Sequence, residues 1–465
     1  MNRIIYKSLA IVTIALTLSA CAGRKTYERP QAIDEKLFRT ESPATDAQSD
    51  ATLSWRNIFT DPLLQQHISK ALSNNLDVRV AMQSVISAQA YLKQSKAAFI
   101  PTLSVGANYT RSTSSLNAGG SAPDRTYNNL FDITGNASWE ADIWGKLSAQ
   151  KRASYASYLA TLEAQKAVQS EVVATLATAY YQLLMLDEQK KVLEQTIEFR
   201  TKSLETTKQL KKAGSTTEVA TKQIEALVYN AQAQLITINN SVWALENTIC
   251  VLLGEEPHTI ERSTLAEQQF PTQFRQGYAV SLLENRPDVA RAELNLRNAF
   301  ELTNVARSNF YPTLTLSARG GISSTELDTW FSAKSMFANF IAGLAQPILN
   351  RRQIRTQYEV QKAAQETALL NFKKAILSAG KEVSDAMRQF SSQDEFIQLK
   401  TQEMKAYQDA TDYSKQLFDS GMVNYLEVIT AEVNRLNAEL SVANAQFIRM
   451  QYGITLYKAL GGGWR

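Results

Sequence analysis

Residues 146–213 read KLSAQKRASYASYLATLEAQKAVQSEVVATLATAYYQLLMLDEQKKVLEQTIEFRTKSLETTKQLKKA and contain neither glycine nor proline. An α-helix of this length rises about 1.5 Å per residue and spans roughly 100 Å, far more than a usual globular helix. Apolar residues keep helical spacing along it, and charged residues such as Asp187 and Lys190 separate them. The segment is therefore predicted to be one amphipathic helix of coiled-coil type and not a membrane span.

Further helices are predicted on both sides of this segment. Gly214 supplies a helix stop, and the Ser and Thr residues after it can cap a return helix over residues 217–253. Upstream, Asp61 and the proline after it form a helix start, and neither glycine nor proline interrupts residues 62–100. We therefore expect an antiparallel helical hairpin with its tip at Gly214, preceded by another helix.

Between the first predicted helix and the long helix, apolar residues occur at every second position instead of at helical spacing. Polar and acidic residues, among them Asp132, Glu140 and Asp142, fill the alternate positions of the second segment. Strands of about 10 residues with one apolar and one polar face are typical of a transmembrane β-barrel, and the three acids would then line a pore and favour cations. A soluble hairpin on a core has the same pattern. The apolar positions are Leu103, Val105, Ala107 and Tyr109, then Phe131, Ile133, Ala137, Trp139 and Ile143.

The N-terminus is predicted to be a secretory signal over residues 1–20. Arg3 and Lys7 precede a short apolar run that is too short to span a bilayer as a helix. The string Leu-Ser-Ala-Cys that ends at Cys21 resembles the bacterial lipobox, in which the cysteine is acylated and becomes the first mature residue. The resemblance implies a lipid anchor at Cys21, and Ala22 implies sorting to the outer membrane. An ordinary signal with an incidental cysteine is the alternative.

Composition argues against several functional classes. The 465 residues are 44% apolar and 20% charged, and the net charge of +4 falls to +2 without the two leader cations, so no nucleic-acid footprint is present. His67 and His258 are the only histidines, and neither has a second ligand at metal spacing. No nucleophile elbow or phosphate loop occurs. We expect no enzyme, no cofactor and no metal site, and Cys250 is predicted to be a buried small hydrophobe.

The chain is internally duplicated. The block Phe-Ile-Pro-Thr-Leu at 99–103 recurs 211 residues later as Phe-Tyr-Pro-Thr-Leu at 310–314, and Gly214 recurs 207 residues later as Gly421. The second half is therefore predicted to repeat the first, with strands at 313–322 and about 336–348. One long helix is predicted over 350–418, in which Gly380 is the only glycine or proline and could mark a bend. The predicted divisions are the signal 1–20, a lipid-anchored arm 21–61, a first repeat 62–253, an irregular connector 254–280 and a second repeat 281–465.

Four strands per chain cannot close a transmembrane barrel, because eight is the practical minimum and an open edge in lipid leaves backbone groups unsatisfied. If the barrel reading holds, the chain must oligomerise. A dimer would give eight strands, and a trimer would give twelve with a wider lumen.

These features together resemble an outer-membrane factor of the TolC family, in its lipoprotein branch. The resemblance covers nearly the whole mature chain and implies a mainly α-helical, duplicated chain that forms a homotrimer. Its twelve-stranded β-barrel would be continued by a long helical tunnel into the periplasm, and substrates would come from an inner-membrane transporter through a periplasmic adaptor. The motifs include Asp142-Ile143-Trp144-Gly145-Lys146, Arg286-Pro287-Asp288, Gln346-Pro347-Ile348 and the terminal Leu-Gly-Gly-Gly-Trp at 460–464.

The resemblance also implies two functional regions. The hairpin tips would meet the adaptor, although their glycines also serve as helix stops. The periplasmic gate would lie just past the second tip, where Leu426 could be an apolar constriction or a coiled-coil core position. Glu427 could supply a charge or lie on a solvated face, and Thr430 stands where relatives often carry an aspartate. The tips are Gly214, Ser215 and Thr216, then Gly421, Met422 and Val423. A periplasmic coiled-coil spacer without a pore is the rival function.

Overall fold

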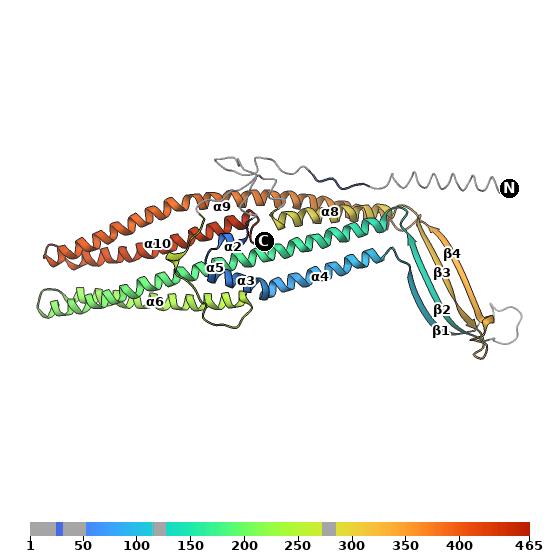
Figure 1. Ribbon diagram of the computed structural model, residues 1–465, viewed down its shortest axis with the longest axis horizontal. Coiled ribbons are helices and arrows are strands. Elements are labelled where there is room, and N and C mark those ends of the chain that lie inside the picture. The colour runs from blue at the N-terminus through green and yellow to red at the C-terminus, as the bar shows by residue number, and fades with distance from the viewer. Residues whose placement is uncertain (1–24, 31–52, 114, 116–126, 272–284) are drawn as a thin grey trace. The chain divides into compact units, whose positions relative to one another are not determined.

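The computed structural model describes residues 25–30, 53–113, 115, 127–271 and 285–465 (Figure 1). The predicted signal and Cys21 lie outside the described residues. The chain divides into two compact units, and each unit draws segments from both predicted repeats, so the units do not coincide with the repeats. Unit 1 comprises residues 1–30, 86–160 and 292–372, and unit 2 comprises 31–85, 161–291 and 373–465. No helix in the described part of the chain is long and apolar enough to cross a membrane.

Two very long helices dominate the fold. Helix α5 comprises Lys146–Lys212 and helix α9 comprises Gln353–Asp419, and each has 67 residues. Their return helices are α6, Glu218–Leu253, and α10, Tyr425–Ala459. Helix α9 continues through Gly380, in agreement with the prediction of one long helix. One glycine costs only about 1 kcal/mol relative to alanine, which a long packed helix tolerates.

The helix predicted over residues 62–100 is two helices, α3 over Pro62–Asn74 and α4 over Leu76–Ala97. Asn75 separates them, and its side-chain oxygen accepts hydrogen bonds from the backbone N–H groups of Asp77 at 2.9 Å and Val78 at 3.1 Å. Its side-chain nitrogen donates to the carbonyl of Leu252 at 2.9 Å. The prediction of one helix is wrong because an asparagine cap can start a new helix without glycine or proline.

Unit 1 contains one antiparallel sheet in the order β1-β2-β3-β4. The strands are β1, Thr102–Thr113; β2, Tyr127–Ala141; β3, Thr313–Ser324; and β4, Met336–Ala345 (Figure 1). Directly opposed residues share a face of the sheet. The register aligns Leu103 with Ala137, Ala137 with Ala318, and Ala318 with Phe340, so the predicted apolar face is continuous across all four strands.

The helices and strands of the second half begin at the same offsets from those of the first half as the repeated sequence motifs. Helix α8, Pro287–Ser308, has 22 residues like α4, and β3 has 12 residues like β1. Both begin 211 positions after their counterparts, whereas α9 begins 207 positions after α5. Each half therefore runs through helix, strand, strand, long helix and return helix.

Unit 2 is held by a buried polar cluster around Asp61. Its carboxylate caps α3, accepting from the N–H of Leu63 at 2.8 Å, and also accepts from the Tyr180 hydroxyl at 2.8 Å and the Gln268 amide at 3.0 Å. Ser263 donates to Oδ2 of Asp61, which also accepts from Tyr180 and Gln268, whereas Leu63 donates to Oδ1. Burial opposes ionisation, but these hydrogen bonds outweigh it and lower the pKa of Asp61. The predicted cap is confirmed, and the same side chain ties α3 to α5 and to the connector.

Candidate functional site

The two predicted tips lie together in unit 2. Gly214 and Gly421 have φ of 76° and 71°, the left-handed conformation that ends a helix with a Schellman-type turn. In both tips the residue after the glycine donates its N–H to a carbonyl five residues earlier, at 2.9 Å. Residues of both tips, including Ser215, Thr216 and Val423, line one cavity of about 720 Å³. The duplication thus builds two matching tips that form one surface.

The three predicted gate residues share an exposed face at the start of α10. Leu426 is 52% exposed and also lines the cavity between the tips, and Glu427 and Thr430 are exposed. Val428 and Ile429 between them are 2% and 8% exposed and pack inward. Leu426 is therefore not a core position within its own chain. The Thr430 hydroxyl donates to the Leu426 carbonyl at 2.9 Å.

A buried charge cluster follows the gate face and was not predicted. Glu432 is 5% exposed, and one of its carboxylate oxygens has no hydrogen-bond partner. Arg200 of α5 is 2% exposed and donates to the Leu227 carbonyl at 3.1 Å. Burial raises the pKa of Glu432 to about 7, although the positive charges of Arg200, Arg435 and Lys415 act in the opposite direction. The sequence carries a signal for this cluster, because residue 432 lies midway between buried Val428 and Leu436 at helical spacing.

The three predicted pore-lining acids have partners within their own chain. Asp132 is 6% exposed and accepts from the Asn108 amide at 3.1 Å, and Glu140 forms an ion pair with Lys146 at 2.9 Å. Asp142 lies beyond the end of β2, and its carboxylate accepts the N–H of Leu147 at 2.8 Å. The predicted alternation therefore does not extend to Asp142, because its side chain starts α5. Pore lining by Asp132 and Glu140 stays a prediction.

The apolar face of the sheet is exposed, and the sheet has two open edges. Leu103 of β1 is 76% exposed, Val105 is 74% exposed, and Phe340 of β4 is 71% exposed. Among the described residues, β1 and β4 each pair with one neighbour only. Long apolar edge strands of this kind normally pair or aggregate in water. The apolar face therefore needs lipid or another apolar surface to cover it, and the two edges need further strands to pair with.

An apolar stripe on α6 is also uncovered. Tyr229, Ile236 and Trp243 are spaced by seven residues and are 62%, 62% and 70% exposed. Heptad spacing of large apolar side chains is the pattern of a helix that packs on another helix. Within the described residues of one chain, these side chains stay largely exposed.

Residues 25–30 form an ordered arm along α8 in unit 1. The Lys25 carbonyl accepts from the Asn304 amide at 3.2 Å, and the Tyr27 ring packs edge-on against Phe300 with centroids 5.7 Å apart. Arg29 forms a bidentate ion pair with Glu293, with both distances 2.7 Å. The arm therefore runs antiparallel to α8.

Among the residues that the structure describes, no group of three or more His, Cys, Asp or Glu side chains could hold a metal ion. Cys250 is free and buried, as predicted, and its sulfur accepts the N–H of His258 at 3.3 Å.

The model of the outer membrane efflux protein family matches residues 67–255 and 279–462. The chain is 27% identical over 463 residues to the probable outer membrane lipoprotein SilC of Salmonella typhimurium, covering 98% of this chain and 99% of that protein. It is 27% identical over 467 residues to the solvent efflux pump outer membrane protein SrpC of Pseudomonas putida, covering 99% and 98%. The cation efflux system protein CusC of Escherichia coli O157:H7 is 27% identical over 459 residues, covering 97% and 98%. A crystal structure of CusC superposes with a TM-score of 0.84 at 26% identity, covering 94% of this chain and 99% of that one.

Proposed function

Because the chain belongs to the outer membrane efflux protein family, we propose that it forms the outer-membrane channel of a tripartite efflux system. The observation that carries the proposal is the four-stranded sheet, which exposes a continuous apolar face and leaves both edges open. Each half of the chain then leads from its second strand into a 67-residue helix. A sheet of this kind suits lipid, and helices of this length suit a tunnel that reaches away from the membrane.

A homotrimer closes the barrel with an open lumen, whereas the eight strands of a dimer would leave an interior filled by side chains. Three copies contribute twelve strands, which exceeds the eight-stranded minimum and leaves a lumen wide enough for solutes. The open edges of β1 and β4 would then pair between neighbouring chains. The heptad stripe of Tyr229, Ile236 and Trp243 would pack on a helix of the next chain in the tunnel wall. The two repeats, 62–253 and 281–465, would supply equivalent parts of barrel and tunnel.

The remaining parts of the chain take their roles from this arrangement. Acylated Cys21 anchors the mature chain in the outer membrane, and SilC is itself named an outer membrane lipoprotein. The surface formed by the two tips meets a periplasmic adaptor, which links the channel to an inner-membrane transporter. Leu426, Glu427 and Thr430 face the tunnel entrance as the gate, and Asp132 and Glu140 line the barrel.

The relatives bear on the cargo. CusC is named for cation efflux and SrpC for solvent efflux, yet both are 27% identical to this chain. Equal similarity to both supports a channel whose cargo is chosen by its inner-membrane partner.

The test is the assembly state in the membrane. Cells expressing the full chain are fractionated, and the outer-membrane fraction is run on a denaturing gel with and without heating. We expect a band of trimer mass that collapses to monomer on heating. Cys21→Ala, with its signal peptide exchanged for a non-lipoprotein signal, separates the anchor from the barrel, because a barrel keeps this variant in the membrane. Its release as a soluble monomer would instead identify a periplasmic spacer.

A further inference from the structure

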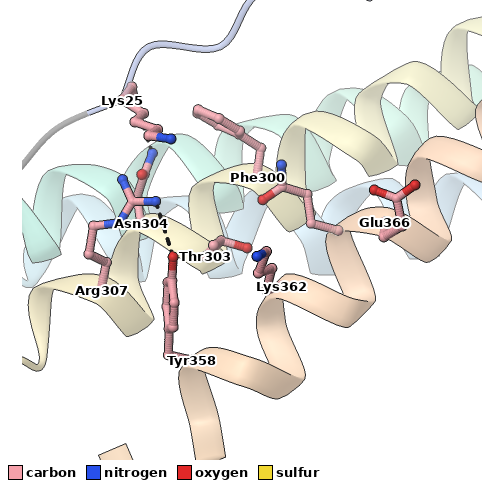
Figure 2. A pocket seen from close by; sticks show the side chains of 9 residues that line it. Lys25, Phe300, Thr303, Asn304, Arg307, Tyr358, Lys362 and Glu366 are labelled. Atoms are coloured by element: carbon pink, nitrogen blue, oxygen red, sulfur yellow. Dashed lines mark hydrogen bonds between the residues drawn. The ribbon is translucent and has the colours of Figure 1, made fainter. Parts of the chain in front are cut away.

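A small basic pocket in unit 1 is lined by none of the residues assigned to the gate, the tips or the pore. Its volume is about 210 Å³, below the roughly 300 Å³ at which pockets for drug-sized ligands begin. Figure 2 shows Lys25 from the arm, Arg307 from α8 and Lys362 from α9 around the same space. The pocket therefore takes a small group, and cations from three separate segments surround it.

The walls of the pocket are fixed by hydrogen bonds between these segments. Thr303 of α8 donates to the Gln361 carbonyl of α9 at 3.1 Å, and Asn304 of α8 donates to the Lys25 carbonyl of the arm at 3.2 Å. Thr303 and Asn304 are 4% and 7% exposed. Because the arm and both helices are tied at this point, the backbone positions that carry Lys25, Arg307 and Lys362 are held close together.

The charge of the pocket favours an anion. Arg307 donates to the Tyr358 hydroxyl at 3.4 Å, the dashed line in Figure 2. This hydrogen bond lowers the pKa of Tyr358, and the positive charges of Arg307, Lys362 and Lys25 act in the same direction. Glu366 is the only carboxylate among the lining residues. Among the described residues, no ion pair neutralises the three cations, so most of their N–H donors are available.

From this geometry we infer that the pocket binds a phosphate group. A phosphate presents several charged oxygens, which match one guanidinium and two ammonium groups better than a single carboxylate does. The group can be the headgroup of a phospholipid or a phosphate free in solution. The site itself does not depend on the channel, whereas the lipid source rests on the proposed membrane anchor.

The surroundings of the pocket point to the lipid source. Phe310, two residues after the end of α8, packs edge-on against Tyr358 with centroids 5.7 Å apart. Trp144 stacks on Tyr311 at 4.9 Å, immediately before β3 begins at Thr313. Aromatic residues at strand ends mark the level of the lipid headgroups in membrane barrels.

The short chain between Cys21 and Lys25 also places the pocket near the lipid headgroups. The chain length places Lys25 within about 14 Å of the proposed acyl-bearing Cys21, because Lys25 is the fourth residue after it. An acyl chain in the inner leaflet would therefore hold Lys25 close to the phosphates of that leaflet.

The experiment titrates the purified full-length protein in detergent with short-chain phosphatidylglycerol, and separately with inorganic phosphate, and counts bound ligand by native mass spectrometry. The pocket variant is Lys25→Gln/Arg307→Gln/Lys362→Gln. The control variant changes three exposed lysines outside the pocket, Lys93→Gln/Lys96→Gln/Lys373→Gln. Each cation removed should weaken phosphatidylglycerol binding about fivefold, so the pocket variant should lose roughly 100-fold and the control variant nothing.

A second variant is expected to bind more tightly, which a misfolded protein would not do. Glu366→Gln removes the one carboxylate and should tighten binding about fivefold. Pocket-dependent binding of phosphatidylglycerol supports the lipid source, and pocket-dependent binding of inorganic phosphate alone supports a free phosphate. Equal binding by the pocket and control variants overturns the site. The pocket variant should keep wild-type channel conductance, which separates this site from the channel.

Discussion

The buried carboxyl group of Glu432 makes the stability of this protein depend on pH in a direction that can be worked out. Its folded-state pKa of about 7 exceeds the ordinary value of 4.5 because burial disfavours the charge. Between these values the folded chain binds more protons than the unfolded chain, so stability falls as pH rises. Each pKa unit corresponds to about 1.36 kcal/mol, so the ionised carboxylate costs roughly 3 kcal/mol above pH 7 and nothing below pH 4.5.

Glu432→Gln removes this cost and keeps the shape of the side chain. At pH 8 the variant should be more stable than the wild type by up to about 3 kcal/mol, and at pH 4.5 the two should be equal. The assay is thermal unfolding in detergent, followed by circular dichroism at several pH values. The control is Glu395→Gln, an exposed glutamate on α9, which should change stability by less than about 0.5 kcal/mol at any pH.

The opposite result would refute this reasoning. Arg200 is buried beside Glu432, and Arg435 follows on the same helix. If the carboxylate were ionised and paired with these cations, Glu432→Gln would leave a buried positive charge uncompensated. The variant would then lose about 3–5 kcal/mol at pH 8.

Three further predictions concern the sheet, the connector and the tip. Gly321→Ala places a Cβ 2.0 Å from the Ile133 carbonyl oxygen and should reduce the yield of heat-modifiable trimer, whereas Gly106→Ala, with nothing within 4 Å, should not. Asp61→Asn removes an acceptor from Tyr180 and Gln268 and should cost about 1–3 kcal/mol at pH 7 in denaturant unfolding. Because the folded-state pKa of Asp61 is lowered, the wild type should be more stable than Asp61→Asn above pH 3.8, and this difference should disappear as pH falls through the folded-state pKa. A stability difference that survives in strong acid would contradict an ionised cap. Gly421→Ala strains a residue at φ 71° by about 1–2 kcal/mol and should weaken capture of the adaptor in pull-downs, whereas Ser420→Ala should capture it normally.

Backbone regularity was predictable from the sequence because its determinants are local. The absence of glycine and proline over residues 146–212 was enough to predict α5, and the two-residue period was enough to predict both faces of the sheet. Sequence rules based on glycine, proline and periodicity failed where a polar side chain accepts hydrogen bonds from the first backbone N–H groups of a helix. Asn75 starts a helix without a breaker, and Asp142 leaves the strand pattern to cap α5.

The site was less predictable, because burial of a charged residue depends on partners far along the chain. The helical spacing of Glu432 between Val428 and Leu436 indicates burial, but the nearby charge of Arg200, which comes from α5, is visible only in the structure. The contacts of the arm could not be predicted from the sequence, because its hydrogen bonds and ion pairs reach α8 about 270 residues away. The tips were predictable as two glycine turns, but only the structure brings them to one cavity.

The central claim is a channel that is closed at the gate face of α10. Single-channel conductance in planar bilayers tests it most directly, with wild type compared against Leu426→Ala and Glu427→Ala. We predict a small, cation-selective conductance for the wild type and a larger one in at least one of the two variants. Protein that is inserted and trimeric but shows no conductance in any variant would contradict a pore.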